Sequence, residues 1–278
     1  MQKENSGFIQ QRNTKIVYST YGSGPALLIC PVPWGVNNRK WETILSLSQF
    51  FTLIFVEPRG VGGSGPVADK NEYSITQLIK DIDVVREYLK IDSWFVMGQS
   101  AAGFTALEYT LAYPAKIKKL IIVCSSPTGF FHKGTIRDRE HPRYNEVKDI
   151  AETFRKEFTA ERFREYMKKV YTMDIQNPKA LPEIEKVFGE ADISIERYKY
   201  FATVELNRYN VIEKLSTIIQ PTLIIAGKHD VHVSPSQSEI MHKKIPNSQY
   251  VLLEHCGHFP WLDDPNGFVK LVVEYLSR

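Results

Sequence analysis

Short apolar runs alternate with amphipathic stretches along most of the chain. Continuous apolar runs, typical of strands covered on both faces, occupy 26–30, 51–56, 94–97, 120–124 and 221–227. Apolar residues three or four positions apart, as at Leu78, Ile82, Val85 and Leu89, predict helices. We expect helices over 41–47, 74–90, 101–113, 235–245 and 267–276, and further strands at 7–11, 15–20 and 249–253. This alternation predicts an α/β fold with a mostly parallel sheet and helices on both faces.

The pattern changes after about residue 126, because no buried strand run occurs before residue 210. Charged and aromatic residues there predict helices near 146–158, 160–171, 181–188 and 194–207. We therefore expect a core formed by residues 1–125 and 211–278, with residues 126–210 inserted as a helical cap. The cap aromatics should mostly pack within the cap, and a few should line a pocket: Phe130, Phe131, Tyr144, Phe154, Phe158, Tyr198 and Phe201.

Composition and charge narrow the function classes. Hydrophobic residues make up 43% and charged residues 24%, which is typical of a globular protein. A net charge of +3 is too small to indicate nucleic acid or an anionic membrane as a partner, so we expect neither. No apolar run is long enough to span a membrane, and no signal-peptide pattern opens the chain. Three cysteines without motif spacing, Cys30, Cys124 and Cys256, indicate reduced thiols and a cytoplasmic setting. No sequence pattern indicates the oligomeric state.

A candidate nucleophile lies at the junction between the strand at 94–97 and the helix at 101–113. Ser100 lies between small residues in Gly98-Gln99-Ser100-Ala101-Ala102-Gly103. This arrangement is typical of a nucleophile elbow, in which the N–H after the serine, here of Ala101, faces the attacked carbonyl oxygen. Ala102 stands where the usual pattern has a second glycine. The alternative is that Ser100 is an ordinary helix N-cap.

A serine nucleophile needs a base and a group that orients the base. Asp230 and His258 each follow a predicted strand, and reactive groups gather at the carboxyl ends of strands in such sheets. The order Ser100, Asp230, His258 suits a catalytic triad, with His255 as a competing base. His229, Asp230 and His232 lack a recognisable metal-ligand spacing, so we expect no metal and no organic cofactor.

These motifs together resemble the α/β-hydrolase superfamily, in the branch of the proline iminopeptidases. The loop Glu57-Pro58-Arg59-Gly60-Val61-Gly62-Gly63-Ser64 is similar to the family's D-x-R-G-x-G-x-S segment, with Glu for Asp. The segment from Pro221 to Asp230 resembles the acid-bearing segment, and Gly257-His258 the histidine segment. Matching Pro33 to the family's proline makes Val32 the second oxyanion donor beside Ala101, because a proline has no N–H to donate. Trp34 is the alternative donor if the loop is shifted.

The resemblance implies an enzyme that hydrolyses a small ester or amide through an acyl-enzyme. An aminopeptidase of the proline iminopeptidase type would hold a free amine with a cap carboxylate, for which Glu205 is the first candidate; Trp34 is the other candidate substrate contact. A carboxylesterase or lactonase, or a C–C bond hydrolase, could use the same triad. A non-catalytic ligand-binding module on this fold is the alternative from another class.

Overall fold

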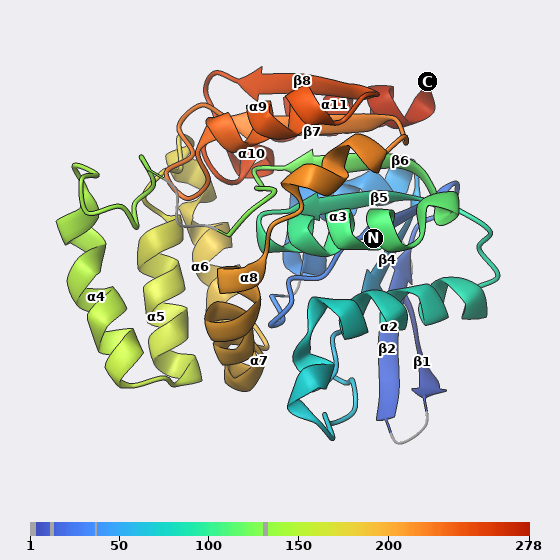
Figure 1. The fold of residues 1–278 in the computed structure, drawn as a ribbon, viewed down its shortest axis with the longest axis horizontal. Helices are drawn as coiled ribbons and strands as arrows, with labels where there is room; N and C mark the ends of the chain where they lie inside the picture. Colours follow the sequence, from blue (N-terminus) through green and yellow to red (C-terminus); the bar gives the residue numbers. More distant parts are fainter. Residues whose placement is uncertain (1–3, 12–13, 37, 130–132) are drawn as a thin grey trace.

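A computed structural model of the protein describes residues 4–11, 14–36, 38–129 and 133–278. Phe130 and Phe131, two of the aromatics expected in the cap, lie outside these residues. The alternation of strands and helices that the sequence predicts is confirmed throughout the described parts. Figure 1 shows the arrangement.

One twisted sheet organises the molecule. Within the described residues it has eight strands, in the spatial order β1 (Glu4–Gln11), β2 (Thr14–Tyr21), β4 (Thr52–Val56), β3 (Ala26–Ile29), β5 (Trp94–Gln99), β6 (Ile117–Val123), β7 (Thr222–Gly227) and β8 (Ser248–Leu253). β3 to β8 run parallel, whereas β1 and β2 pair antiparallel at one edge. The parallel arrangement brings the carboxyl ends of β5, β7 and β8 to one edge of the sheet, where Ser100, Asp230 and His258 follow them.

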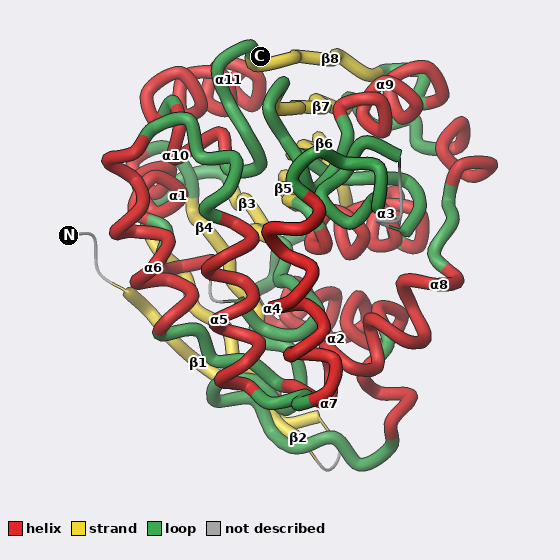
Figure 2. Tube along the Cα trace, turned by 90° about the vertical axis from the view of Figure 1, so that its left-hand side faces the viewer, coloured by secondary structure: helices red, strands yellow, loops and turns green. Residues whose placement is uncertain are grey.

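Helices cover both faces of the sheet. Figure 2 shows α1 (Glu42–Ser46), α10 (Pro260–Asp263) and α11 (Pro265–Ser277) on one side of the strands, and α2 (Ile75–Tyr88), α3 (Ala101–Ala112) and α9 (Pro235–Lys244) on the other. Short 3-10 segments complete the connections: Asn38–Lys40, Leu47–Gln49, Lys70–Tyr73, Pro114–Lys116, Pro178–Ala180 and Ile212–Thr217. The capping signal at Ser74 is confirmed, since its Oγ accepts the Gln77 N–H at 3.2 Å. Every helix in the described parts is too short or too polar to cross a bilayer.

A helical segment separates β6 from β7. It contains α4 (Tyr144–Lys156), α5 (Ala160–Tyr171), α6 (Leu181–Gly189), α7 (Ile195–Tyr200), a π-helical turn (Phe201–Glu205) and α8 (Leu206–Arg208). In Figure 1, α4 to α7 gather at one end of the molecule, and Figure 2 shows α4, α5 and α6 in the foreground when viewed from that end. Thr128 and Asn210 form an antiparallel bridge, so the two ends of the segment meet where it leaves the sheet.

Candidate active site

Ser100 lies on a sharp turn between β5 and α3. Its backbone has φ 53° and ψ −124°, a strained conformation for a residue with a side chain. A Cβ at Gly98 would collide with the Ala102 carbonyl, and a Cβ at Gly103 would collide with the Ser125 side chain. Close approach of strand and helix therefore requires these two glycines, whereas the turn accommodates Ala102, which is completely buried.

Asp230 follows the end of β7, and its carboxylate is held from two sides. Oδ1 accepts the backbone N–H groups of His232 at 2.8 Å and Val233 at 2.9 Å. Oδ2 lies 2.8 Å from Nδ1 of His258. The backbone bonds fix the carboxylate, so one oxygen is left aimed at the imidazole.

His258 follows β8 in the loop that precedes α10, and its side chain is completely buried. Because Asp230 accepts at Nδ1, the neutral ring carries its proton there and Nε2 is an acceptor. No described residue provides a hydrogen-bond partner for Nε2. The Tyr171 ring stacks on the imidazole with centroids 5.5 Å apart, and Gln99 Nε2 donates to the His258 carbonyl at 3.0 Å. The ring is thus held with one nitrogen available.

Ser100 and His258 line the same small cavity, of about 20 Å³. Ala101, Val32 and Trp34 line it too, so both candidate positions for the second oxyanion donor remain open. The Trp34 ring packs edge-on against Tyr198 of α7, with centroids 5.2 Å apart. Five of the residues singled out in the sequence therefore line one cavity: Ser100, Ala101, His258, Val32 and Trp34. Asp230 contacts His258 from outside this cavity.

Glu205, the cap carboxylate expected at the substrate, is not among the described residues that line this cavity. Its Oε1 accepts the Ile75 N–H at 3.0 Å, at the first turn of α2. A carboxylate is stabilised there because the first N–H groups of a helix have no partner within the helix. Glu205 therefore joins the π-helical turn to α2 and does not line the Ser100 cavity.

Two carboxylates that belong to no sequence motif hold the histidine loop. Asp174, between α5 and α6, accepts the His258 N–H at 3.0 Å with Oδ2. Asp263, at the end of α10, makes the opposite contact. Its Oδ1 accepts the N–H groups of Gln176 at 2.7 Å and Asn177 at 3.0 Å, which follow Asp174 in the chain. Burial raises the pKa of Asp174 well above its ordinary value, and the Asp230 charge adds to the shift. This reciprocal pairing connects the helical segment to the backbone of the proposed base.

Arg197 of α7 connects the same segment to the loop after β3. It is 1% exposed and donates to the carbonyl of Pro33, beside Val32 and Trp34. It also donates to the Arg59 carbonyl at 3.2 Å and the Tyr73 carbonyl at 3.3 Å. Desolvation lowers its pKa to about 10. A periodicity analysis treats such an arginine as surface, so only the tertiary structure identifies it.

A metal ion fits this site poorly. Cys124, Asp230 and His258 bring one potential ligand atom each within 4.8 Å of one another. The Asp230 and His258 atoms are already paired, and burial raises the pKa of Cys124, which favours the thiol over the ligating thiolate. His229 is exposed while His232 is buried, so these two histidines do not converge on Asp230. All three cysteines are buried, and none of them forms a disulfide with another described residue.

Comparison with known proteins gives a consistent result. The model of the family described as "alpha/beta hydrolase fold" matches residues 25–265. The chain is 28% identical to a pimeloyl-[acyl-carrier protein] methyl ester esterase of Nitrosospira multiformis, over 91% of this chain and 95% of that protein. It is 25% identical to a proline iminopeptidase of Clostridioides difficile, over 99% of each.

Among solved structures, an alpha/beta fold family hydrolase of Bacillus anthracis str. Sterne superposes with a TM-score of 0.86 at 25% identity. The match covers 98% of this chain and 99% of that one. The family match spans most of the sheet and both ends of the helical segment. The chain therefore belongs to the alpha/beta hydrolase fold family, and it is a hydrolase.

Proposed function

We propose that the protein is a serine hydrolase that cleaves a small carboxylic ester with Ser100, His258 and Asp230. The observation that carries the proposal is the arrangement of His258: Nδ1 is fixed on Asp230, while Nε2 is unpartnered beside the cavity that Ser100 lines. A base held in one tautomer with a free nitrogen is what a serine alcohol requires, because the alcohol must lose its proton as it attacks.

The reaction would proceed in two halves. Ser100 Oγ adds to the ester carbonyl carbon while His258 Nε2 takes the hydroxyl proton, and Asp230 stabilises the imidazolium. The N–H groups of Ala101 and Val32, or Trp34 in place of Val32, would hold the oxyanion. The C–O bond to the alcohol then breaks and the alcohol leaves with the proton from His258. Water releases the acid from Ser100 by the same sequence of steps, and no cofactor takes part.

Residues 126–210 would serve as the cap of this site, on a core of residues 1–125 and 211–278. The Thr128–Asn210 bridge supports these boundaries, because it lies close to both ends of the proposed cap. Met167 and Tyr171 of α5 and Phe188 of α6 line the Ser100 cavity, as a cap would. The lack of a disulfide among the three described cysteines supports a reducing, cytoplasmic setting.

The lining of the cavity favours an ester over a peptide with a free amine. Among the described residues that line it, none carries a carboxylate, and an unpaired ammonium would be costly to bury. The second candidate is an aminopeptidase, which the likeness to proline iminopeptidases over nearly the whole chain favours. Lactones, and compounds that are hydrolysed at a C–C bond, are further candidate substrates for the same triad.

A substrate comparison tests the proposal. Short-chain aryl esters should be hydrolysed faster than prolyl- and alanyl-arylamides, and Glu205→Gln should leave that preference unchanged. A preference for free-amine arylamides that is lost on acetylation would instead establish the aminopeptidase. His258→Ala should abolish ester turnover almost completely, whereas His255→Ala, at an exposed position, serves as the matched control with turnover near that of the unaltered protein.

A further inference from the structure

Asp174, in the connection between α5 and α6, contacts both loops that carry the proposed base and its orienting acid. Its Oδ2 accepts the N–H of His258 at 3.0 Å and the N–H of Val231 at 3.4 Å. Val231 directly follows Asp230 in the chain. A single carboxyl oxygen therefore joins the backbones of the two loops, in parallel with the 2.8 Å hydrogen bond between the Asp230 and His258 side chains.

The backbone around Asp174 is packed closely against the histidine loop. Asp174 is 2% exposed, and a Cβ at Gly257 would collide with its backbone carbonyl. From the opposite direction, Asp263 accepts the N–H groups of Gln176 and Asn177, which fixes the backbone just after Asp174. The carboxyl group of Asp174 therefore has a fixed position from which it holds the two loops.

The contact with the two loops requires an acceptor oxygen and does not require a charge. Burial raises the pKa of Asp174 well above its ordinary value, and the Asp230 charge adds to the shift, so the neutral acid is favoured relative to an exposed aspartate. Oδ1 has no hydrogen-bond partner among the described residues and lies 3.8 Å from Nε2 of His232. A proton on Oδ1 leaves Oδ2 as the acceptor of both N–H groups, and the amide of an asparagine offers the same oxygen.

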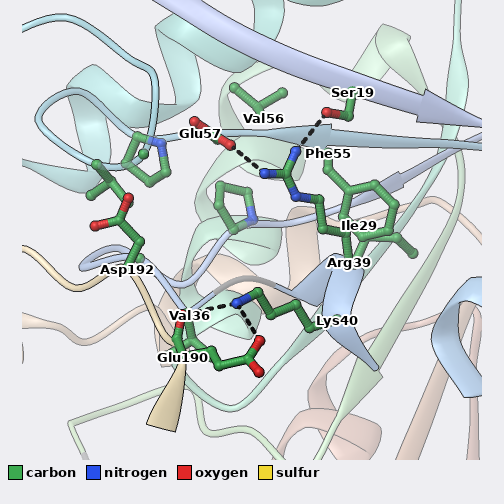
Figure 3. Close-up of a pocket in the computed structure, with 15 residues that line it drawn as sticks. Ser19, Ile29, Val36, Arg39, Lys40, Phe55, Val56, Glu57, Glu190 and Asp192 are labelled. Carbon is green, nitrogen blue, oxygen red and sulfur yellow. Dashed lines mark hydrogen bonds and ion pairs between the residues drawn. The ribbon is translucent and has the colours of Figure 1, made fainter. Parts of the chain in front are cut away.

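A second contact between the helical segment and the core serves as a comparison. Lys40 donates to Glu190, directly after α6, at 3.0 Å beside a cavity of about 200 Å³ (Figure 3). The lining of that cavity contains none of Ser100, Asp230 and His258, and the two paired side chains are 30% and 54% exposed. This pair attaches the segment to the core outside the cavity that Ser100 lines, so a change at Glu190 is the matched control for Asp174.

We propose that Asp174 is a positioning residue for the hydrolysis: through the backbone, it holds the His258 imidazole in the orientation that proton transfer from Ser100 requires. A displacement of about 1 Å at a reacting group can lower a rate by about 10²-fold, so the backbone support behind the base should affect kcat. Met167 and Tyr171, which line the Ser100 cavity, lie on α5 just before Asp174. The element that lines the cavity therefore also positions the base. The inference rests on the proposed function and adds a residue that supports its base.

Two substitutions at Asp174 separate its acceptor oxygen from its charge. Asp174→Ala removes the acceptor, so kcat for p-nitrophenyl acetate should fall by about 10- to 100-fold. KM should change by less than about threefold, because Asp174 does not line the cavity at Ser100. Asp174→Asn keeps an acceptor oxygen and should recover kcat to within about threefold of the original value. Glu190→Ala should leave kcat and KM within about twofold of their original values.

A spectroscopic signal shows whether the base itself has moved. The Nδ1 proton of His258, which is hydrogen-bonded to Asp230, should give a proton resonance downfield of the amide protons. In Asp174→Ala this resonance should shift or broaden while the protein is still folded, and in Asp174→Asn it should stay in place. Asp174→Thr provides the same test if Asp174→Ala prevents folding, because threonine is close to aspartate in volume but its hydroxyl is one bond short of the carboxyl oxygens.

The outcomes separate this proposal from the proposed function. Unchanged kcat in Asp174→Ala or Asp174→Thr, in a protein that loses its activity in Ser100→Ala, would overturn the positioning role alone. A loss of about tenfold or more in Asp174→Asn would also overturn it, because an acceptor oxygen would then not be sufficient. Full activity in Ser100→Ala would overturn the proposed function itself, whatever the result at Asp174.

Discussion

At the scale of single residues, Asp230 has two tasks that fall on different oxygens. Oδ1 fixes the loop through two backbone N–H groups and Oδ2 faces His258. The Asn side chain in Asp230→Asn can still accept the two backbone N–H groups. It then presents its NH2 group to Nδ1 of His258, which favours the tautomer with the proton on Nε2, where the ring cannot act as the base. We expect a normally folded protein whose kcat falls by a factor on the order of 10⁴. Steady-state kinetics and thermal unfolding check this, and a kcat within about tenfold of the original would exclude Asp230 as the orienting group.

His232 should give the folded protein a dependence on acid pH. It is 1% exposed, and burial lowers its pKa well below the ordinary 6.5. Below that value the unfolded chain binds a proton that the folded chain rejects, so stability is lost as the pH falls towards the lowered pKa. His232→Phe should remove this loss, changing the slope by up to about 1.4 kcal/mol per pH unit.

Urea unfolding of both proteins between pH 5 and 7.5 measures this difference. Asp174, His258, Tyr171, Arg137 and His141 act on His232 in the original protein and are all retained in the variant, so the two curves differ through this imidazole and its coupling to these groups. Parallel stability curves would show that His232 does not carry the effect.

At the scale of elements, α7 supports the loop after β3 through Arg197. Arg197→Met would leave the buried carbonyls of Pro33, Arg59 and Tyr73 without this donor. Each unsatisfied buried acceptor costs about 1–3 kcal/mol, so we expect a loss of about 3 kcal/mol in the free energy of unfolding. Because Pro33 lies between Val32 and Trp34, the two candidate oxyanion donors, kcat of Arg197→Met should also fall. The factor by which kcat falls should exceed the factor by which KM changes.

Lys199→Met is the matched control, since Lys199 is an exposed cation on the same helix. Denaturant unfolding and ester kinetics on both variants distinguish a local effect from general weakening of α7. Equal effects of the two changes would contradict a specific role for Arg197.

The elements themselves could be predicted from the sequence because their signals are local. An apolar run between Leu120 and Cys124 indicates a buried strand wherever it lies, and Gly98 and Gly103 around Ser100 indicate a tight turn. The contacts of Asp174, Arg197 and Glu205 join segments 84, 164 and 130 positions apart. No periodicity encodes such pairings, so sequence patterns neither single out Asp174 and Arg197 nor place Glu205 beside Ile75.

At the scale of the whole molecule, the helical segment and the sheet should unfold together. Asp174 and Asp263 bind the histidine loop to the segment, Arg197 binds the loop after β3, and Lys40 pairs with Glu190. We therefore expect one calorimetric transition whose enthalpy equals the van't Hoff value. All four tryptophans lie outside residues 126–210, but Trp34 packs against Tyr198 and Trp41 against Phe188, so their fluorescence reports the sheet together with its contacts to the segment. A fluorescence midpoint separate from the calorimetric one would show that the segment unfolds independently.

The proposal that Ser100 is the nucleophile is tested most directly by covalent labelling. An aryl fluorophosphonate should add one phosphonyl group, seen in the intact mass, and peptide mapping should place it on Ser100. Labelling should vanish in Ser100→Ala and become much slower in His258→Ala. An adduct on any other residue, or no adduct on a folded protein, would contradict the account.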